Sequence, residues 1–244
     1  MAKLLLNADG KVLTSNDKVL KAPEVDTSSE DGLIDGSITT YSNDSITSVR
    51  NYAFYMCNKL TNVELPQVTQ IGEYAFERCS SLVNIKIPEV ITIYKQAFKY
   101  CSALKKIEIP KVTTIVSNAF QSCGALADIE LPQVEKINTY VFDYCTSLES
   151  VKIPRVTTIN SNAFSYCYKL KKVVLGGTSV CRLNSDAFTG CYRFTGTVNE
   201  TYNPDGLKDG RIYVPDDLVD SYKAATNWSV YVDIIVPLST LVED

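Results

Sequence analysis

The sequence predicts an α/β solenoid, in which a parallel β-sheet forms one face of an elongated body and short helical or 3-10 turns form the other. Three observations lead to this prediction. A segment of 22 residues recurs six times, with an altered seventh copy, and repetition at such a fixed period is typical of solenoids. Each copy combines an alternating apolar pattern with a three-residue apolar spacing. One copy cannot bury its own apolar face, so neighbouring copies must cover each other.

Each copy carries the same core residues in the same order. The second copy, Val68 to Pro88, reads VTQIGEYAFERCSSLVNIKIP. A phenylalanine is followed after three residues by a cysteine, and after three more by a leucine. These columns contain Phe54, Phe76, Phe98, Phe120, Phe142, Phe164 and Phe188; Cys57, Cys79, Cys101, Cys123, Cys145, Cys167 and Cys191; and Leu60, Leu82, Leu104, Leu126, Leu148 and Leu170, with Phe194 in the seventh leucine position. We expect these columns to form one continuous core.

Two apolar periods assign the secondary structure within a copy. Ile85 and Ile87 share one face while Lys86 takes the other, which is the pattern of a strand. In Ala75 to Leu82 the apolar residues recur every three positions, and this spacing favours a helical turn or a 3-10 segment. A short extended piece is expected at Val68 to Ile71. The proline after each strand, at Pro66, Pro88, Pro110, Pro132 and Pro154, ends the ladder because it lacks an N–H group.

The repeats divide the chain into four parts. Residues 1–21 predict a small β-meander, with strands at Leu4 to Leu6, Val12 to Thr14 and Lys18 to Lys21 joined by good turn sequences. Residues 22–45 form a polar linker followed by an irregular capping strand within Ser37 to Ser45. Residues 46–194 form the solenoid, and residues 195–244 form a cap.

The cap is predicted from a change of pattern after the repeats. Arg211 to Val214 resembles one more strand, and Asp216 can cap a helix that runs to about Ala225. Trp228 is expected to pack beneath that helix. A last strand is expected at Tyr231 to Val236.

Composition excludes several function classes. The chain has a net charge of -4 and contains no histidine, which rules out a Ser-His-Asp triad, a Cys-His pair and any histidine-containing zinc site. Lysines are dispersed among glutamates, so no basic stripe for nucleic acid is present. No glycine-rich phosphate loop or calcium loop appears, and we expect no cofactor and no metal. The first residues lack the apolar core of a signal peptide, and no segment approaches the roughly 20 residues of a membrane span.

The eight cysteines predict core residues and neither a disulfide framework nor a metal site. Seven of them occupy one repeat position, and no CxxC pair occurs. Equivalent positions on adjacent coils lie roughly 5 Å apart, so distance alone does not prevent a disulfide. The flanking apolar columns nevertheless indicate inward-pointing, reduced thiols that act as small core residues. Cys181, outside the column, is the one candidate for an exposed thiol.

The repeat V-x-x-I-x-x-x-A-F-x-x-C-x-x-L-x-x-I-x-I-P resembles that of the BspA-like leucine-rich repeat family of bacterial and protozoan surface proteins. The resemblance covers Ile46 to Phe194, with two departures: Val141 replaces the column alanine, and Gly176 and Gly177 are inserted before the seventh copy. It implies a leucine-rich-repeat solenoid at the cell surface or secreted, and a role in adhesion to host matrix proteins or between bacterial cells. The strand, helix and tryptophan at the end are also similar to the cap of other family members.

Two surfaces are candidates for partner binding. The outward strand positions form one row across the sheet, and tyrosines precede the column cysteine in three copies. The candidate residues are Glu64, Lys86, Glu108, Glu130 and Lys152, with Val174 ending that row, and Tyr100, Tyr144 and Tyr166. The charges could equally form a solvated, self-complementary face. The tyrosines could equally lie over the repeat edges and cover the core.

The sequence therefore predicts a non-enzymatic protein that binds a protein or a glycan through an extended repeat surface. One alternative is a phage tail or other assembly component, virion-associated or cytoplasmic, with the solenoid as its receptor-binding part. An enzyme would need a lysine, tyrosine or carboxylate mechanism, and no such constellation is visible. The ligand, the oligomeric state and the binding face stay open.

Overall fold

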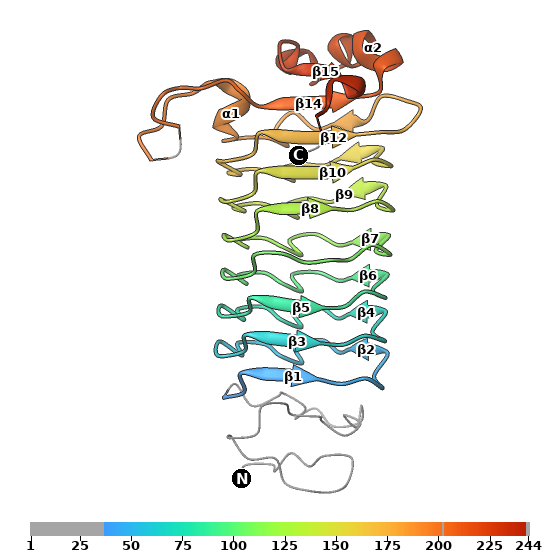
Figure 1. Cartoon of the computed structure of the whole chain (residues 1–244), viewed down its shortest axis with the longest axis vertical. Coiled ribbons are helices and arrows are strands. Elements are labelled where there is room, and N and C mark those ends of the chain that lie inside the picture. Colours follow the sequence, from blue (N-terminus) through green and yellow to red (C-terminus); the bar gives the residue numbers. More distant parts are fainter. Residues whose placement is uncertain (1–36, 202, 243–244) are drawn as a thin grey trace, which may run out of the picture.

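A computed structural model describes residues 37–201 and 203–242. Its coils stack in a straight column, with the first coils at one end and the helical cap at the other (Figure 1). This confirms the predicted solenoid with a parallel sheet along one face. The β-meander predicted for residues 1–21 lies outside the described residues.

The long strands lie on one side of the column, which we call the sheet side. Successive strands pair in parallel with a register of one repeat, so that Asn62 faces Asn84 and Glu64 faces Lys86. The coil between β5 and β8 contains Glu108. It pairs with the sheet side through a single parallel bridge between Lys86 and Glu108. The strands are β1 (Thr40–Ser42), β3 (Asn62–Glu64), β5 (Asn84–Lys86), β8 (Asp128–Glu130), β10 (Ser150–Ile153), β12 (Lys172–Leu175), β14 (Arg211–Val214) and β15 (Ile235–Pro237).

The strand predicted as an irregular cap before the first repeat is instead a regular member of the ladder. Tyr41 in β1 pairs with Val63 in β3, one repeat later. Tyr41 is buried and its ring meets Phe54 edge to face, with the centroids 4.8 Å apart. The regular stacking therefore begins before Ile46.

A second set of strands, only two residues long, forms the short-strand side. It contains the extended piece predicted at Val68 to Ile71, whose last two residues form β4. These strands are β2 (Ser48–Val49), β4 (Gln70–Ile71), β6 (Thr92–Ile93), β7 (Thr114–Ile115), β9 (Lys136–Ile137), β11 (Thr158–Ile159) and β13 (Arg182–Leu183). Each places one buried apolar residue in the core, such as Ile71.

The third side, the turn side, differs from the helical or 3-10 segment that was predicted there. Glu77 N–H donates to the Tyr74 carbonyl and Cys79 N–H to the Phe76 carbonyl, which are the bonds of consecutive four-residue turns. Phe76 N–H instead donates to Ala97 O of the next coil at 2.8 Å. Residues with positive φ break the run of helical dihedral angles along these turns. Backbone hydrogen bonds within a coil therefore alternate with hydrogen bonds between coils, and no helix forms.

The phenylalanine and cysteine columns form the centre of the core, as predicted. The rings from Phe54 to Phe188 stack nearly parallel, and the centroids of Phe76 and Phe98, for example, are 5.2 Å apart. All eight cysteines are buried. The Cys101 thiol donates to Phe76 O at 3.1 Å, and the equivalent bond recurs for five other column cysteines. Each of these six thiols thus links two coils inside the core.

The cap closes the open end of this stack. It comprises α1 (Tyr192–Thr195), η1 (Asp216–Leu218), α2 (Val219–Ala224), η2 (Ser229–Tyr231) and η3 (Leu238–Thr240), together with β14 and β15. The edges of Phe194 and Tyr231 meet the outer face of the Phe188 ring, with centroids 5.4 and 5.7 Å away. Trp228 is fully buried and packs against Tyr222 of α2, as predicted.

Three local predictions for the cap region were wrong. Cys181 is only 1% exposed, because Tyr222 and Trp228 cover it and bond to its backbone. The Asp216 side chain accepts a hydrogen bond from Ser239 N–H and makes none to the start of η1. The last strand begins at Ile235, because Ser229 to Tyr231 form a 3-10 turn.

Candidate functional site

The sheet side presents its outward side chains as straight rows of charges. Lys86 lies 3.2 Å from Glu64 of the preceding coil, and Lys152 lies 3.7 Å from Glu130. Glu108 pairs with Lys106 of its own coil at 2.8 Å, which lowers the pKa of the Glu108 carboxyl and raises that of the Lys106 ammonium group. All of these side chains are exposed. The predicted row of charges therefore exists, and each member lies beside an opposite charge, which for Glu108 is Lys106 of its own coil.

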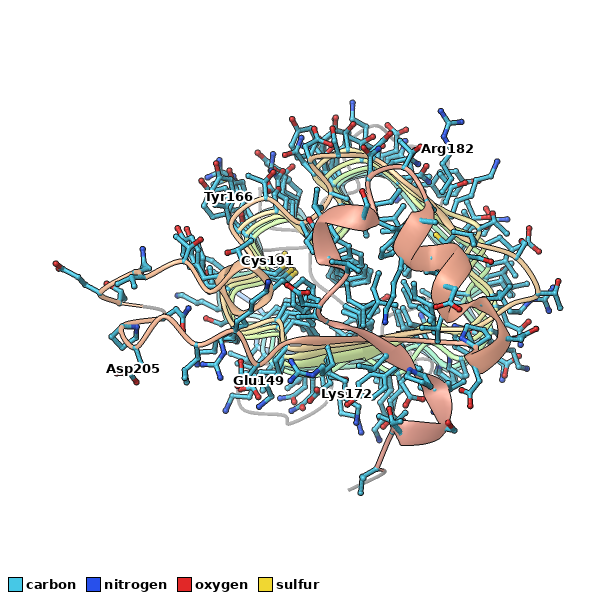
Figure 2. All side chains as sticks on the ribbon, turned by 90° about the horizontal axis from the view of Figure 1, so that it is seen from above. Glu149, Tyr166, Lys172, Arg182, Cys191 and Asp205 are labelled. Carbon is cyan, nitrogen blue, oxygen red and sulfur yellow. The ribbon has the colours of Figure 1, made fainter. Side chains whose placement is uncertain are left out.

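Further ion pairs extend this pattern around the edges of the sheet side. Lys171 lies 2.7 Å from Glu149, and Lys111 lies 2.6 Å from Glu89. Glu149 and Lys172 point away from the core on this side when the column is viewed along its axis (Figure 2). Exposed ion pairs contribute little to stability, but they restrict where each charge lies.

Val174, which ends the row of outward strand positions, is buried. It is paired in register with Tyr213 of β14, and Tyr213 with Val236 of β15. In Figure 1 the last turn of the chain, η3, lies in front of β14 and β12. The uncovered part of the sheet side therefore runs from β1 to β10.

The predicted tyrosines lie on the turn side in an unusual backbone conformation. Tyr100, Tyr144 and Tyr166 have φ values of 62°, 57° and 56°, in the left-handed region. A bulky residue is rare there, because its Cβ approaches its own backbone. Tyr166 lies at the turn corner, away from the core residue Cys191 (Figure 2).

Two columns on the turn side share this conformation. The first column stands just before the column alanine and contains Tyr52, Tyr74, Gln96, Asn118, Tyr140, Asn162 and Asp186. The second column stands just before the cysteine and contains Met56, Arg78, Tyr100, Ser122, Tyr144, Tyr166 and Gly190. All members except Asp186 have positive φ. Sequence reasoning did not detect this, although Asn118, Asn162 and Gly190 at equivalent positions are the signal for it.

The tyrosine rings contact one another along the column axis. Tyr144 and Tyr166 stack with centroids 4.5 Å apart, and Tyr52 and Tyr74 stack at 4.7 Å. Arg78 lies over the Tyr100 ring at 5.1 Å. Tyr100 and Tyr144 are still 40% and 43% exposed. The rings therefore cover each other in part and still present edges and hydroxyls to solvent, and partner binding by these residues stays a prediction.

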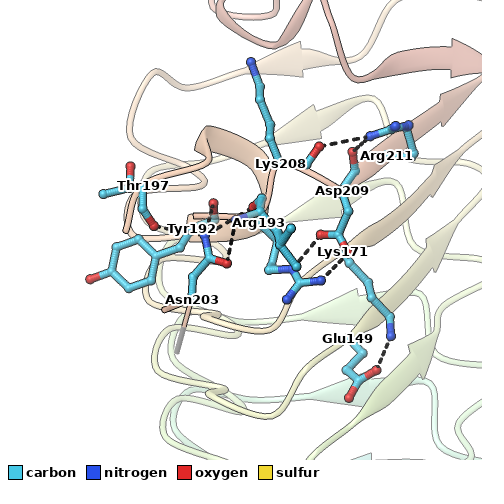
Figure 3. A network of polar contacts seen from close by, with 11 residues as sticks. Glu149, Lys171, Tyr192, Arg193, Thr197, Asn203, Lys208, Asp209 and Arg211 are labelled. Carbon is cyan, nitrogen blue, oxygen red and sulfur yellow. Dashed lines mark hydrogen bonds and ion pairs between the residues drawn. The ribbon is translucent and has the colours of Figure 1, made fainter. Parts of the chain in front are cut away.

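Residues 195–201 and 203–206 project beyond the outline of the coils next to this face (Figure 2). The buried Asn203 amide donates to Thr197 O at 3.0 Å and to Leu207 O at 3.2 Å, which closes this loop. Arg193 holds its base through two hydrogen bonds to Asp209 (Figure 3), which lower the pKa of that carboxyl. The loop is thus anchored at both ends.

The described part of the chain offers binding surfaces and no reactive cluster. Across residues 37–201 and 203–242, no three or more cysteine or acidic side chains gather as metal ligands. Burial raises the pKa of the Cys101, Cys145 and Cys167 thiols well above the usual range, so these groups are poor nucleophiles. Within the same residues, no helix is long and apolar enough to cross a membrane.

Comparison with known families agrees with this geometry. The BspA type leucine rich repeat region matches in six copies, over residues 37–142 and 69–195. The chain belongs to the BspA-type leucine-rich repeat family. Leucine-rich repeat domains generally mediate protein binding and are generally non-enzymatic.

Two solved structures resemble this leucine-rich repeat chain in both sequence and fold. A leucine-rich repeat protein of T. pallidum is 30% identical, with a TM-score of 0.60, over 70% of this chain and 80% of that one. A leucine-rich cell surface protein of Faecalibacterium prausnitzii A2-165 is also 30% identical, with a TM-score of 0.56, over 69% of this chain. The match spans 43% of that second protein, less than half its length. Among curated proteins, none matched the sequence.

Proposed function

We propose that this chain is a non-enzymatic adhesion module that binds a partner protein at the cell surface through its sheet side. Family membership supports binding as the activity, and the F. prausnitzii relative is described as a cell surface protein. The absence of histidine also excludes a Ser-His-Asp triad, a Cys-His pair and a histidine-containing zinc site.

The observation that carries the proposal is the fixed row of charges across the sheet side. The Lys86–Glu64 and Lys152–Glu130 pairs place opposite charges on adjacent strands, at the strand spacing of about 4.8 Å, with Glu108 between the two pairs. Such a pattern on a rigid, flat surface gives specificity for a partner with complementary charges. The same side chains on a flexible loop would lose this advantage, because ordering them on binding costs entropy.

The test is a binding screen of the purified chain against extracellular-matrix proteins, with a glycan array in parallel. We expect saturable binding to a protein, weakened by salt because the surface contacts are ionic. Binding to glycans alone would contradict the proposal.

A charge exchange locates the surface. The double variant Glu130→Lys with Lys152→Glu keeps an ion pair between β8 and β10 but reverses its direction. We expect unchanged thermal stability and about a tenfold or greater loss of affinity. The matched control exchanges Lys111 and Glu89, which also form an ion pair but lie at the edge of the sheet side. If the two exchanges changed the affinity equally, the sheet side would not be the binding surface.

A further inference from the structure

The two columns on the turn side have an internal symmetry. The described repeats contain seven coils with the phenylalanine position, and the coil of Phe120 is the fourth. If a second copy of the chain lies antiparallel against the turn side, with a two-fold axis at this central coil, coil one faces coil seven and coil three faces coil five. Each column then faces the same column of the partner copy, because the axis lies across the column direction.

In the second column this arrangement brings compatible side chains together. Tyr100 would face Tyr144, and the exposed guanidinium group of Arg78 would face Tyr166. Ser122, on the axis, would face its own copy. Met56, which is 50% exposed, would face Gly190 and the Tyr166 ring that lies over this glycine. Aromatic pairs, a cation over a ring and a methionine beside a ring all favour contact.

The first column gives an independent match under the same operation. Each of its three tyrosines faces a carboxylate or amide group: Tyr52 would face Asp186, Tyr74 would face Asn162, and Tyr140 would face Gln96. Asn162 Nδ2 donates to Asp186 Oδ2 at 3.1 Å within the chain, so the other oxygens of these two groups are the ones left to accept from a phenol. Asn118 on the axis would face its own copy; its Nδ2 donates to Gln121 Oε1 at 3.0 Å, which leaves its second N–H and its Oδ1 for a symmetric amide pair. No like charges meet in either column.

The spacing of the rows also favours a second copy as the partner. Stacked phenylalanine rings set the rise at 4.7 to 5.5 Å per coil. A partner must have the same rise to meet every row, and another copy of this chain has it. A partner whose rows are spaced differently would lose register after a few rows. The straight column in Figure 1 allows the contact to continue over all seven coils.

Backbone strain supports an interface at this surface. Tyrosine occupies six of the twelve non-glycine positions with positive φ in these two columns. Asparagine or glycine would fit the same backbone with less strain, and both occur in the columns. The stacked rings also leave few free faces for a sugar, while ring edges and hydroxyls remain available for protein contact.

We infer that the turn side is a self-association surface, through which two copies of this chain form an antiparallel dimer centred on Ser122. The face is roughly 30 Å long at about 5 Å per coil and roughly 15 Å wide, or about 900 Å² for the pair, which is below the roughly 1,200 Å² of stable specific interfaces and within the range of weak, transient ones. We therefore expect a weak, reversible dimer. This inference does not depend on the proposed binding by the sheet side.

The experiment is cysteine cross-linking of the full chain, in which the native thiols stay silent because all eight are buried. Ser122→Cys should cross-link with itself under mild oxidation, at least about tenfold faster than Ser150→Cys on the sheet side, the matched control. A mixture of Tyr100→Cys and Tyr144→Cys should cross-link as the mixed pair, which separates the antiparallel dimer from a parallel one. Equal rates for Ser122→Cys and Ser150→Cys, or a preference for identical pairs in the mixture, would overturn the inference.

Light scattering during size-exclusion chromatography of the unaltered chain provides a second measurement. The mass should rise toward that of a dimer with concentration, and Tyr100→Ser with Tyr144→Ser should raise the dissociation constant by about tenfold or more. A chain that stays monomeric at every concentration would overturn the inference. So would tyrosine variants that leave the dimer intact but abolish binding to another protein.

Discussion

Each bonded column cysteine combines two properties at the scale of the single residue. Its side chain is small enough for the gap between the phenylalanine and leucine columns, and its thiol proton reaches the phenylalanine carbonyl of the preceding coil, as in Cys123 to Phe98 O at 3.2 Å. Alanine would leave that position without a thiol donor, and serine would bring a more strongly solvated group into an apolar core. The cysteine column is therefore a structural feature of the stack.

Buried thiols make the stability of the fold depend on alkaline pH. Burial raises the pKa of the Cys101, Cys145 and Cys167 thiols, whereas an unfolded cysteine titrates near 8.5. Above that pH the unfolded chain releases protons that the folded chain keeps, so the free energy of unfolding falls as the pH rises. Each such thiol lowers it by about 1.4 kcal/mol per pH unit. Urea denaturation between about pH 7.5 and 10 measures this slope.

The matched variant for this prediction is Cys145→Ala. At neutral pH its free energy of unfolding should be lower than that of the unaltered chain, because a buried group is lost. As the pH rises, this free energy should fall less steeply than in the unaltered chain, and the difference in slope should equal the contribution of one thiol. A slope identical to that of the unaltered chain would contradict the prediction. Tyr222 and Tyr231, whose pKa values burial raises to about 12, add to the slope only as the unfolded tyrosines begin to ionise near pH 10, and they do so equally in both chains.

At the scale of the element, the turn side shows where the sequence is ambiguous. A three-residue apolar spacing places Phe76, Cys79 and Leu82 inside, whether the backbone is a 3-10 helix or a chain of turns. The strands were predictable because the alternation of apolar and polar residues around Ile85 and Ile87 indicates a β-strand and no other element. The two backbones of the turn differ only in the residues with positive φ, such as Tyr74 and Arg78. Tyrosine and arginine do not signal that conformation, and the signal from Asn118, Asn162 and Gly190 was not used, so the candidate tyrosines could be named without their geometry.

Relief of strain in one of these turns is directly testable. Gln96 has a φ of 56°, and asparagine tolerates this region better than glutamine does. We expect Gln96→Asn to raise the free energy of unfolding by about 0.5 to 1 kcal/mol, measured by urea denaturation. The control is Gln67→Asn, at an exposed position outside the positive-φ set, which should be neutral. Equal effects at both positions would contradict the account of strain.

At the scale of the whole molecule, a repeat stack is only as stable as its ends allow. Interior coils have neighbours on both sides, whereas the last coil would expose the Phe188 ring and the edge of β13. The cap covers both the Phe188 ring and the edge of β13. Trp228 Nε1–H donates to Cys181 O at 2.6 Å, and Cys181 N–H donates to the Tyr222 hydroxyl at 3.0 Å. The sequence indicated a cap and its tryptophan, but Cys181 could not be placed because its cover comes from residues about 40 positions later.

Trp228→Phe should separate the stability of the cap from that of the stack. The variant keeps an aromatic ring beside Phe188 but leaves the buried Cys181 carbonyl without its indole donor, at a cost of about 1 to 3 kcal/mol. Because each coil contacts only its neighbours, the effect should be local. Hydrogen exchange should accelerate at the amides of Cys181, Tyr222 and β13, while the turn amides of the Phe98 and Phe120 coils keep their protection. Uniform acceleration across all coils would mean that the solenoid unfolds as one unit and that the cap is not a separate closing element.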